Sequence, residues 1–489
     1  MIFSNPVLYA DYPDPDVIRV GDTYYMVTTT MHMFPGGDIL VSKDLVRWEL
    51  LCHVFSVPDG TPRQRLDGGD IYGKGMWAGS LRYHNGVFYL LFVCNDTHKT
   101  YCFSASDPSG PWEKHIIEGC FFHDCSVLFD DDGRVYIVSG NREIHLTEME
   151  PDLSRPKEGG LERVILRDRQ ENMPLGFEGS HLYKISGKYY LFLIHWASDG
   201  TKRRTEACWC ADSLTGEFTG RDIYDDDLGF FNMGVAQGGI VDTPDGRWFA
   251  ILFQDRGACG RMPVLVPMVW ENGFPKLQPD VKTLDLPVCE DALRPLYGSD
   301  TLREGAPADY WQWNHMPDTS GFAFTARGYE LTALPAPDLT HAKNTLTQRI
   351  FGPKASFTVT LNAGGLKTGD RAGLCALQGC FAALLAERTD SGFRLVLHSR
   401  EGASVQADVL PDKALIPVNT SVLRLRADFD FTDLKDTVRF LYDTGNGWQP
   451  AGDEHKLRYT LDHFMGARIA LCAFGHGGKA VFSDFEYIH

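Results

Sequence analysis

Five segments of the chain repeat one pattern of polar and apolar positions. Each segment begins with a glycine at an expected turn, continues through aromatic residues and ends in a short apolar run. The segments are GDTYYMVT from Gly21, GVFYLLFV from Gly86, GRVYIVSG from Gly133, GKYYLFLI from Gly187 and GRWFAILF from Gly246. A turn glycine followed by aromatic and β-branched residues is typical of a β-hairpin, and a strand-like run also precedes each glycine. The pattern therefore predicts five hairpins.

A second phrase recurs between these hairpins and places a polar turn before an aromatic residue. Its copies are SKDLVRWE from Ser42, SASDPSGPWE from Ser104 and CADSLTGEF from Cys210. Such a phrase is expected in the outer strand of a four-stranded sheet. Units of roughly 45 to 65 residues with several strands each fit propeller blades better than solenoid turns. Five copies predict a five-bladed β-propeller, because the alternative of a β-sandwich array would not need the same phase in every unit.

The repeat also brings one position of each unit to a common place. In the first unit, which is shorter by two residues, this position is Asp14, seven residues before the turn glycine. In the other four units it lies nine residues before the glycine, at Trp77, Asp124, Glu178 and Gln237. Because the innermost strands of a propeller run along its central axis, these five side chains are expected to converge at one end of the axial channel.

Three of the five positions are carboxylates, and crowded carboxylates repel one another and shift each other's pKa values. One interpretation is a general acid and a general base that flank a glycosidic bond. A second is a calcium site, which also uses oxygen ligands. A third is that these are only turn and strand-start residues, since PDPD around Asp14 reads as a turn. That three acids share one phase argues against the third interpretation.

Composition and charge limit the partners. The 489 residues are 43% hydrophobic, 23% charged and 12% aromatic, and they include 49 glycines and 26 prolines. This balance indicates a globular protein of short strands and many turns. The net charge of −18 argues against nucleic acid or an anionic membrane as a partner. It does not argue against a neutral sugar, whose C–H faces stack on aromatic rings.

Targeting signals and cysteines give weaker indications. No apolar run of about 18 residues predicts a membrane span. The start MIFSNP lacks a basic region and a long apolar core, so no secretory signal is expected. The twelve cysteines form no CxxC pair, so a zinc site is not expected either. We expect free thiols in a reducing compartment, and therefore a cytoplasmic protein.

The motifs that carry the three acids resemble those of glycoside hydrolase family 43, the five-bladed inverting β-xylosidases and α-L-arabinofuranosidases. They are NPVLYADYPDPDVIRVGDTYYM, FPGGDILVSKDLVRWE, MWAGSLRYHNGVFY, HDCSVLFDDDG and GFEGSHLYKISGKYYL, and the resemblance spans residues 5 to about 275. It implies that Asp14 is the general base, that Glu178 is the general acid, and that Asp124 tunes the acid and orients the substrate. It also implies that Arg261, in CGRMPVLVPMVW, reaches a sugar hydroxyl.

The resemblance continues into the second part of the chain. WQWNHMPD, NTLTQRIFGP and GDRAGLCALQG are similar to the C-terminal β-sandwich of the β-xylosidase branch. Independently, residues after about 300 lose the blade repeat and show alternating strands such as SFTVTLNA and FRLVLHSR. We therefore expect an all-β chain with a propeller over residues 1–295 and a concanavalin-like β-sandwich over residues 296–489.

Several positions depart from the family pattern or extend the candidate site. Many relatives have a histidine beside an axial calcium where this chain has Gln237, so no cofactor is expected to be required, and calcium near the axis stays an open possibility. Trp77 suits either a sugar platform or blade packing. Phe34, in MFPGG, is expected to line the sugar site, and His195, at the start of HWASDGTKRR, to border the leaving-group subsite.

The expected activity is the release of xylose from the ends of short xylo-oligosaccharides. Asp14 would deprotonate the attacking water, and Glu178, kept protonated by flanking rings and by Asp124, would protonate the leaving oxygen. Inversion requires the Asp14 and Glu178 carboxyls to lie roughly 6.5 to 9.5 Å apart. The alternatives are an α-L-arabinofuranosidase or a dual enzyme and, from another class, a non-catalytic carbohydrate-binding propeller. The expected partner is a neutral oligosaccharide, and the sandwich could support a homo-oligomer.

Overall fold

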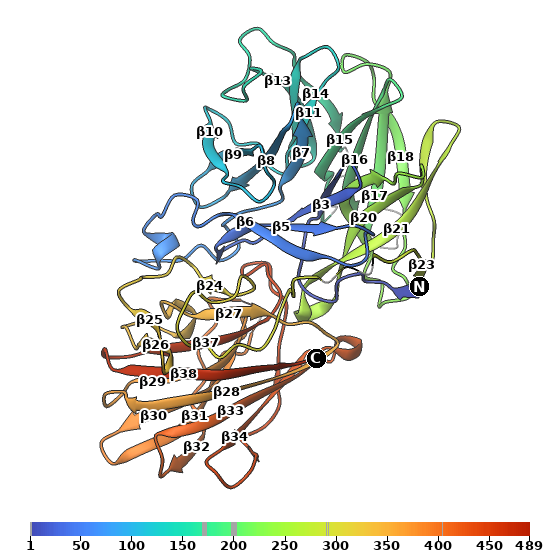
Figure 1. The fold of residues 1–489 in the computed structure, drawn as a ribbon. Coiled ribbons are helices and arrows are strands. Elements are labelled where there is room, and N and C mark those ends of the chain that lie inside the picture. Colours follow the sequence, from blue (N-terminus) through green and yellow to red (C-terminus); the bar gives the residue numbers. More distant parts are fainter. Residues whose placement is uncertain (1, 169–173, 197–202, 290, 292, 403) are drawn as a thin grey trace.

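The computed structural model describes residues 2–168, 174–196, 203–289, 291, 293–402 and 404–489, and it has two lobes of β-sheet (Figure 1). The lobe coloured blue to yellow-green contains five four-stranded sheets, and the lobe coloured yellow to red contains two larger sheets. The predicted all-β chain, with a five-bladed β-propeller followed by a β-sandwich, is confirmed.

Each blade is an antiparallel sheet whose strands follow one another in the chain. Blade 1 contains β2 (Asp16–Val20), β3 (Thr23–Thr28), β5 (Gly36–Ser42) and β6 (Glu49–Phe55). Blade 2 contains β7 (Ser80–His84), β8 (Val87–Cys94), β9 (Lys99–Ala105) and β10 (Glu113–Ile117). Blade 3 contains β11 (Ser126–Phe129), β12 (Val135–Ser139), β13 (Glu143–Met149) and β14 (Glu162–Arg167). Blade 4 contains β15 (Glu178–Ile185), β16 (Lys188–Trp196), β17 (Arg204–Ala211) and β18 (Thr219–Tyr224). Blade 5 contains β19 (Val235–Asp242), β20 (Trp248–Asp255), β21 (Arg261–Glu271) and β22 (Phe274–Leu277).

The five repeated glycines all form the turn between the first and second strands of a blade. They have positive φ angles, between 65° at Gly21 and 84° at Gly86. An added Cβ would meet nothing within 4 Å at any of the five, so space does not explain them. The left-handed backbone does, because glycine adopts it without a steric penalty.

The first strands of the blades stand in a ring around the propeller axis. β2 contacts β7, β7 contacts β11, β11 contacts β15, β15 contacts β19, and β19 contacts β2. No strand is shared between blades 1 and 5. Instead, the N–H of Gly239 donates to the carbonyl of Pro15 at 3.0 Å, and Arg19 pairs with Asp242 at 2.5 Å. Backbone and ion-pair contacts therefore close the ring.

Polar side chains fill the middle of the ring and tie the blades together. The guanidinium of Arg82 donates to Asp16 at 2.6 Å and to the carbonyl of Val127 at 3.1 Å. His181 Nδ1 lies 3.1 Å from Asp16 Oδ1, and the Tyr183 hydroxyl accepts from a backbone N–H of β19. Burial alone would raise the pKa of Asp16, but Arg82 and His181 outweigh it and lower that pKa. This network joins all five blades.

The second lobe is a sandwich of two sheets. One sheet contains β32 (Lys413–Val418), β31 (Gly392–Ser399), β30 (Ala382–Thr389), β29 (Arg371–Leu377), β37 (Arg468–Phe474), β27 (Leu346–Arg349), β24 (Gln312–Asn314) and β4 (Met33–Phe34) in that spatial order. The other contains β25 (Phe322–Thr325), β26 (Gly328–Thr332), β38 (Lys479–Ile488), β28 (Lys354–Gly365), β33 (Val422–Asp430), β34 (Thr437–Asp443) and β35 (Gln449–Pro450), with β36 (His455–Lys456) beside β34. The inner faces bury one large apolar cluster that includes Leu374, Phe357 and Phe482.

The remaining elements are short. β1 (Ile2–Ser4) pairs with β23 (Thr283–Asp285), and four 3₁₀ turns are present in the described residues, η1 (Arg63–Arg65), η2 (Gly257–Cys259), η3 (Leu339–His341) and η4 (Thr432–Leu434). None of the helical segments in the described part of the chain has the length and apolarity needed to cross a bilayer. All twelve cysteines are free thiols.

The two lobes share a sheet and a buried polar interface. β4 belongs to the propeller part of the chain but pairs with β24 of the sandwich, Trp313 opposite Phe34. Beside it, the rings of His32, His315 and His463 lie 4.6, 4.7 and 5.0 Å from the ring of Tyr72, and the His32 ring also lies 5.2 Å from that of His315 and 4.9 Å from that of His463. Both ring nitrogens of His32 and of His463 lack a hydrogen-bond partner among the described residues. We call these four side chains the interface histidine cluster.

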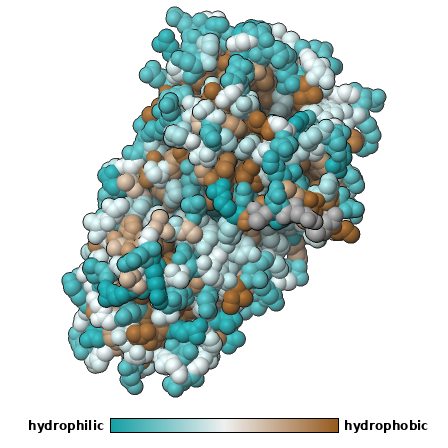
Figure 2. Space-filling view, viewed as in Figure 1, coloured by the Kyte–Doolittle hydropathy of each residue, from teal (hydrophilic) through white to brown (hydrophobic). Residues whose placement is uncertain are grey.

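The outer surface shows no large apolar patch on the face seen in Figure 2, which is mostly hydrophilic. Large hydrophobic side chains that are exposed are spread over both lobes. They include Ile2, Tyr83, Phe231, Val269, Leu415, Val422, Leu461 and Ile488.

Candidate active site

All five ring positions line one pocket at one end of the propeller axis. Its lining residues are Asp14, Met31, Trp77, Ala78, Asp124, Glu178, Arg204, Gln237, Arg261 and Phe464. Asp14, Trp77 and Asp124 lie two or three residues before the innermost strands β2, β7 and β11. Glu178 begins β15, and Gln237 is the third residue of β19. Residues at the same position of the sequence repeat therefore meet at one end of the propeller axis.

The backbone at these positions is unusual. Asp14, Asp124 and Gln237 have φ angles of 52°, 46° and 57°, in the left-handed region that residues other than glycine seldom occupy. Glu178 is followed by Gly179, whose φ is 65° and whose added Cβ would lie 2.7 Å from the Gln237 side chain. Such conformations cost free energy and cluster at functional sites, where surrounding structure enforces them. Here they turn the side chains toward the axis.

Asp14 is held by two donors. Arg261 Nη1 donates to Asp14 Oδ1 at 2.6 Å, and the Thr29 hydroxyl donates to Oδ2 at 2.7 Å. Asp14 and Arg261 are both buried, with 5% and 2% of their surface exposed. The Nε and Nη2 atoms of Arg261 are buried without a partner among the described residues. Buried donors without partners are costly, so this guanidinium is suited to a hydroxyl oxygen of a ligand in the pocket.

Asp124 and Glu178 form a second group with His123. His123 Nε2 lies 3.5 Å from Glu178 Oε2 and 3.8 Å from Asp124 Oδ2, and Asn141 Nδ2 donates to Glu178 Oε2. Burial raises the pKa of Asp124 to about 7, with Glu178 and Asp14 adding to the effect and His123 and Arg261 opposing it. Burial by itself would lower the pKa of His123, but the two carboxylates outweigh it and raise that pKa to about 9.

Aromatic rings form the walls of the pocket. Trp77 is fixed by a hydrogen bond from Nε1 to the carbonyl of Gly73 at 3.1 Å, and its ring lies 5.8 Å from that of Phe464. Phe464 comes from the sandwich lobe, and its ring also lies 4.6 Å from the Arg261 guanidinium. The second lobe therefore completes the pocket.

Two residues that the sequence placed in the site lie elsewhere. Phe34 is fully buried and packs 6.4 Å from Phe55 in the core between blades 1 and 2, because pairing of β4 with β24 turns it away from the pocket. His195 is also buried, with Nε2 2.7 Å from Asp222 and its ring against Phe177. Residues 197–202, which follow it in the predicted subsite loop, lie outside the described residues.

Sequence reasoning also missed four residues, Arg204, Phe464, His123 and Asn141. Arg204 pairs with Asp255 at 2.7 Å at the edge of the pocket. Phe464 carries no repeat signal, because it lies in the other domain. His123 directly precedes Asp124 in the chain. This adjacency to one of the five repeat positions was the only indication in the sequence that His123 belongs to the site.

The residues near the axis do not fit a calcium ion. Deeper on the axis, Asp16 already accepts from Arg82, His181 and the N–H of Leu81. Beside Gln237, the buried Glu206 carboxyl accepts from the Gln237 N–H at 2.7 Å. Calcium takes six to eight oxygen ligands, and the Arg82 guanidinium, which pairs with Asp16 at 2.6 Å, competes directly with a cation at that carboxylate. The alternative of a calcium site at this position is therefore disfavoured.

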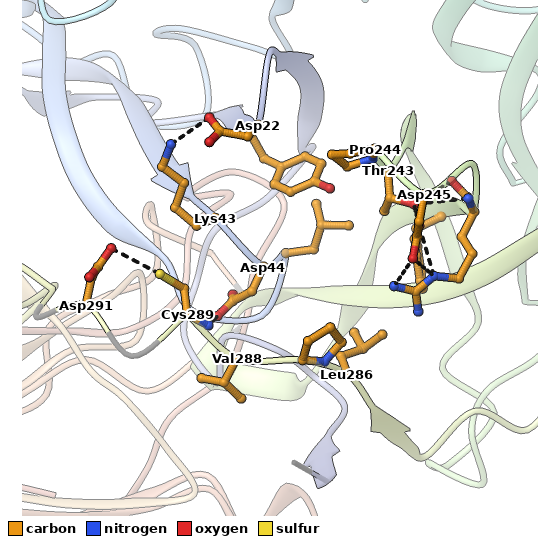
Figure 3. A pocket seen from close by; sticks show the side chains of 15 residues that line it. Asp22, Lys43, Asp44, Thr243, Pro244, Asp245, Leu286, Val288, Cys289 and Asp291 are labelled. Carbon is orange, nitrogen blue, oxygen red and sulfur yellow. Dashed lines mark hydrogen bonds and ion pairs between the residues drawn. The ribbon is translucent and has the colours of Figure 1, made fainter.

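A larger pocket lies away from the carboxylates. It has a volume of about 660 Å³ and is bordered by the far ends of blades 1 and 5 and by the segment that leaves the propeller (Figure 3). Both of its cationic side chains are paired, Lys43 with Asp22 and Arg247 with Asp245, and the Cys289 thiol contacts Asp291. Size alone does not make it the catalytic site, because the strained backbone and the unpaired donors are in the smaller pocket.

Each of the two lobes matches a protein-family model. Residues 3–275 match the glycosyl hydrolases family 43 model, and residues 299–489 match the β-xylosidase C-terminal concanavalin A-like domain. Among curated relatives, a β-xylosidase of Formosa agariphila is 29% identical over 447 residues, which cover 80% of this chain and 75% of the relative. A non-reducing end α-L-arabinofuranosidase of Bacteroides ovatus is 31% identical over 297 residues, 57% of this chain and 54% of the relative.

Solved structures show the same two-lobed fold. A bifunctional GH43-CE protein of Bacteroides eggerthii is 39% identical with a TM-score of 0.91, and the match covers 99% of this chain. The match covers 63% of that protein, so this chain spans less than two thirds of it. A GH43 glycoside hydrolase engineered to display both endo-xylanase and exo-arabinofuranosidase activity is 28% identical with a TM-score of 0.87, and the match covers 100% and 99% of the two chains.

Proposed function

Because the chain belongs to glycosyl hydrolases family 43 and is a glycoside hydrolase, we propose that it is an inverting exo-β-xylosidase that removes single xylose units from short xylo-oligosaccharides. The observation that carries the proposal is the meeting of Asp14, Asp124 and Glu178 in one pocket. Blades of the propeller and Phe464 of the sandwich bound this pocket, and a site enclosed on so many sides suits one terminal sugar rather than the middle of a polymer.

In the proposed reaction, Asp14 acts as the general base. A water molecule attacks the anomeric carbon, and its proton passes to the Asp14 carboxylate. Arg261 and Thr29 fix the orientation of that carboxylate, since each donates to a different oxygen atom. The buried donors that remain on Arg261 bind a hydroxyl of the sugar and so set its distance from the base.

Glu178 acts as the general acid in the same step. As the bond between the anomeric carbon and the glycosidic oxygen breaks, Glu178 gives its proton to that oxygen, and the released alcohol leaves. Asp124 supports this role, because a negative charge within 4.8 Å of Glu178 disfavours a second negative charge there. One displacement converts a β-glycoside into an α-configured product sugar.

The second candidate is an α-L-arabinofuranosidase, alone or together with the xylosidase activity. It is favoured by the arabinofuranosidase of Bacteroides ovatus, which is 31% identical over the matched region. Xylose and arabinose present similar hydroxyl groups, so the same acid, base and arginine serve either sugar. A neutral oligosaccharide is the partner in both cases.

Hydrolysis of 4-nitrophenyl β-D-xylopyranoside and 4-nitrophenyl α-L-arabinofuranoside tests the proposal. We expect release of nitrophenol from the xyloside, xylose as the only sugar lost from xylotriose at early times, and the α-anomer as the first product by NMR. Activity on the arabinofuranoside alone supports the second candidate. Activity on neither substrate, with binding of xylo-oligosaccharides retained, supports a carbohydrate-binding protein and contradicts both enzymatic proposals.

A further inference from the structure

His123 lies next to the catalytic carboxyls, but the proposed reaction gives it no role. It does not line the pocket itself but lies behind Asp124 and Glu178, with its side chain 19% exposed. Its carbonyl accepts from the N–H of Gly140 at 3.0 Å, and its ring contacts Trp77 edge-on at 5.3 Å. The imidazole therefore has a fixed place and does not swing freely.

The charged side chains in and around the pocket fall into two groups, the arginine–aspartate pairs and the group of His123, Asp124 and Glu178. Arg261 pairs with Asp14, and Arg204 pairs with Asp255. Among the described residues, His123 is the one basic side chain within 4 Å of Asp124 or of Glu178, and it reaches both through Nε2. Asn141 donates to Glu178 but carries no charge. The positive charge in direct contact with this carboxyl pair therefore comes from the His123 imidazole, while Arg261 acts on Asp124 from farther away.

Two carboxyls this close titrate as a pair, with two macroscopic pKa values that belong to neither residue alone. The acid step needs the pair to hold one proton. With no proton on the pair, Glu178 cannot donate one, and with two protons Asp124 is neutral and loses the negative charge that supports the acid. A cation beside the pair lowers both macroscopic values together. Burial raises the pKa of Asp124 to about 7, and His123 opposes that rise, so without this cation the pair would bind protons more tightly.

We propose that His123 is a positioning residue whose imidazolium charge keeps the Asp124–Glu178 pair in its singly protonated state at the pH at which the enzyme works. The proposal deepens the proposed function and rests on it for the catalytic readout. His123 acts through the two carboxyls and does not touch the substrate. The charged groups that face it are Asp124 beside it and Glu178 on β15, while Asp14 and Arg261 act on Asp124 from the other side.

The catalytic test compares pH profiles of kcat/KM for the wild type, His123→Asn, His123→Gln and His123→Lys. The neutral variants are expected to shift both limbs of the profile upward by about one pH unit, because the pair binds protons more tightly. His123→Lys, which restores a cation, is expected to bring the limbs back. Loss of activity without movement of either limb, equal in all three variants, would show a purely structural role and overturn the proposal.

A second measurement does not depend on activity. Imidazole ¹⁵N–¹H NMR of the full chain follows the titration of His123 in the wild type and in Glu178→Gln. We expect the midpoint to fall by about one unit in Glu178→Gln, because one of the two neighbouring negative charges is gone. A His123 midpoint that is the same in both proteins overturns the proposal. If the midpoint shifts but the wild type cleaves neither nitrophenyl glycoside, the charge coupling is upheld and the proposed function is rejected.

Discussion

Arg261 donates from Nη1 to the carboxylate of Asp14 at 2.6 Å, although 247 residues separate them in the chain. The pair joins the entry into blade 1 to the start of β21 in blade 5, next to the place where the ring of blades closes. Both groups are buried, but they border the pocket and are not hidden behind it. The ion pair is therefore compatible with Asp14 acting on a water molecule in the pocket.

Asp14→Asn is expected to lower kcat by about 10²- to 10⁴-fold on both aryl glycosides and xylobiose. The loss should be similar for both substrates, because activation of water is needed whatever the leaving group. The free energy of unfolding should fall by about 2 kcal/mol, since Arg261 loses its charged acceptor. Steady-state kinetics and urea unfolding check these values. Asp242→Asn, which removes the partner of Arg19 at the other end of β19, is the matched control and should retain full kcat.

Glu178→Gln is expected to separate substrates by their leaving groups. Cleavage of xylobiose should fall about 10²- to 10⁴-fold, because its alcohol leaving group requires a proton. Cleavage of a dinitrophenyl xyloside should fall far less, because that phenolate leaves without protonation. The ratio of the two kcat values measures the effect. Equal losses on both substrates would argue that Glu178 is not the acid.

Phe464→Ala tests the contribution of the sandwich to the pocket. Removing this ring should raise KM for xylobiose roughly tenfold, since a large buried contact with the sugar is worth about 1 to 2 kcal/mol. Phe474→Ala is the control, because Phe474 packs against the same cluster as Phe464 but does not line the pocket. If both variants change KM equally, the effect comes from packing between the lobes and not from contact with substrate.

The interface histidine cluster should make the protein less stable in mild acid. Burial lowers the pKa of His315 to about 3 and of His463 to about 4, with neighbouring charges modifying the effect. The same histidines have a pKa of about 6.5 in the unfolded chain. Below that pH the unfolded chain binds protons that the folded state excludes, so stability is retained above about 6.5 and falls as the pH drops toward 4.

Urea unfolding at pH 7, 6 and 5 measures this dependence. Each such histidine should contribute up to about 1.4 kcal/mol per pH unit below its unfolded pKa. The difference between the wild type and His463→Phe keeps the effect apart from that of carboxylates such as Asp124, whose pKa is raised to about 7. His463→Phe should flatten the slope, whereas His145→Asn, at an exposed site on blade 3, should leave it unchanged. An unaltered slope in His463→Phe would contradict the assignment.

The repeating architecture and the centre of the site could be predicted from the order of residues along the chain. The five turn glycines and the residues seven or nine positions before them fixed the blades, their phase and the meeting of Asp14, Trp77, Asp124, Glu178 and Gln237. Local physical rules suffice here, because a glycine turn and an alternating strand leave the same signal wherever they occur, and symmetry carries equivalent positions to one axis.

The other side chains that reach the pocket could not be predicted in this way, because packing between distant segments brings them there. Phe464 arrives from a different domain, and no periodicity links residue 464 to blade 2. Phe34 lies in a motif beside the site, yet pairing of β4 with β24 directs its side chain into the core, and His195 is drawn to Asp222 and Phe177. Contacts between distant segments depend on how the lobes pack, and packing selects among conformations that the local sequence leaves equally open.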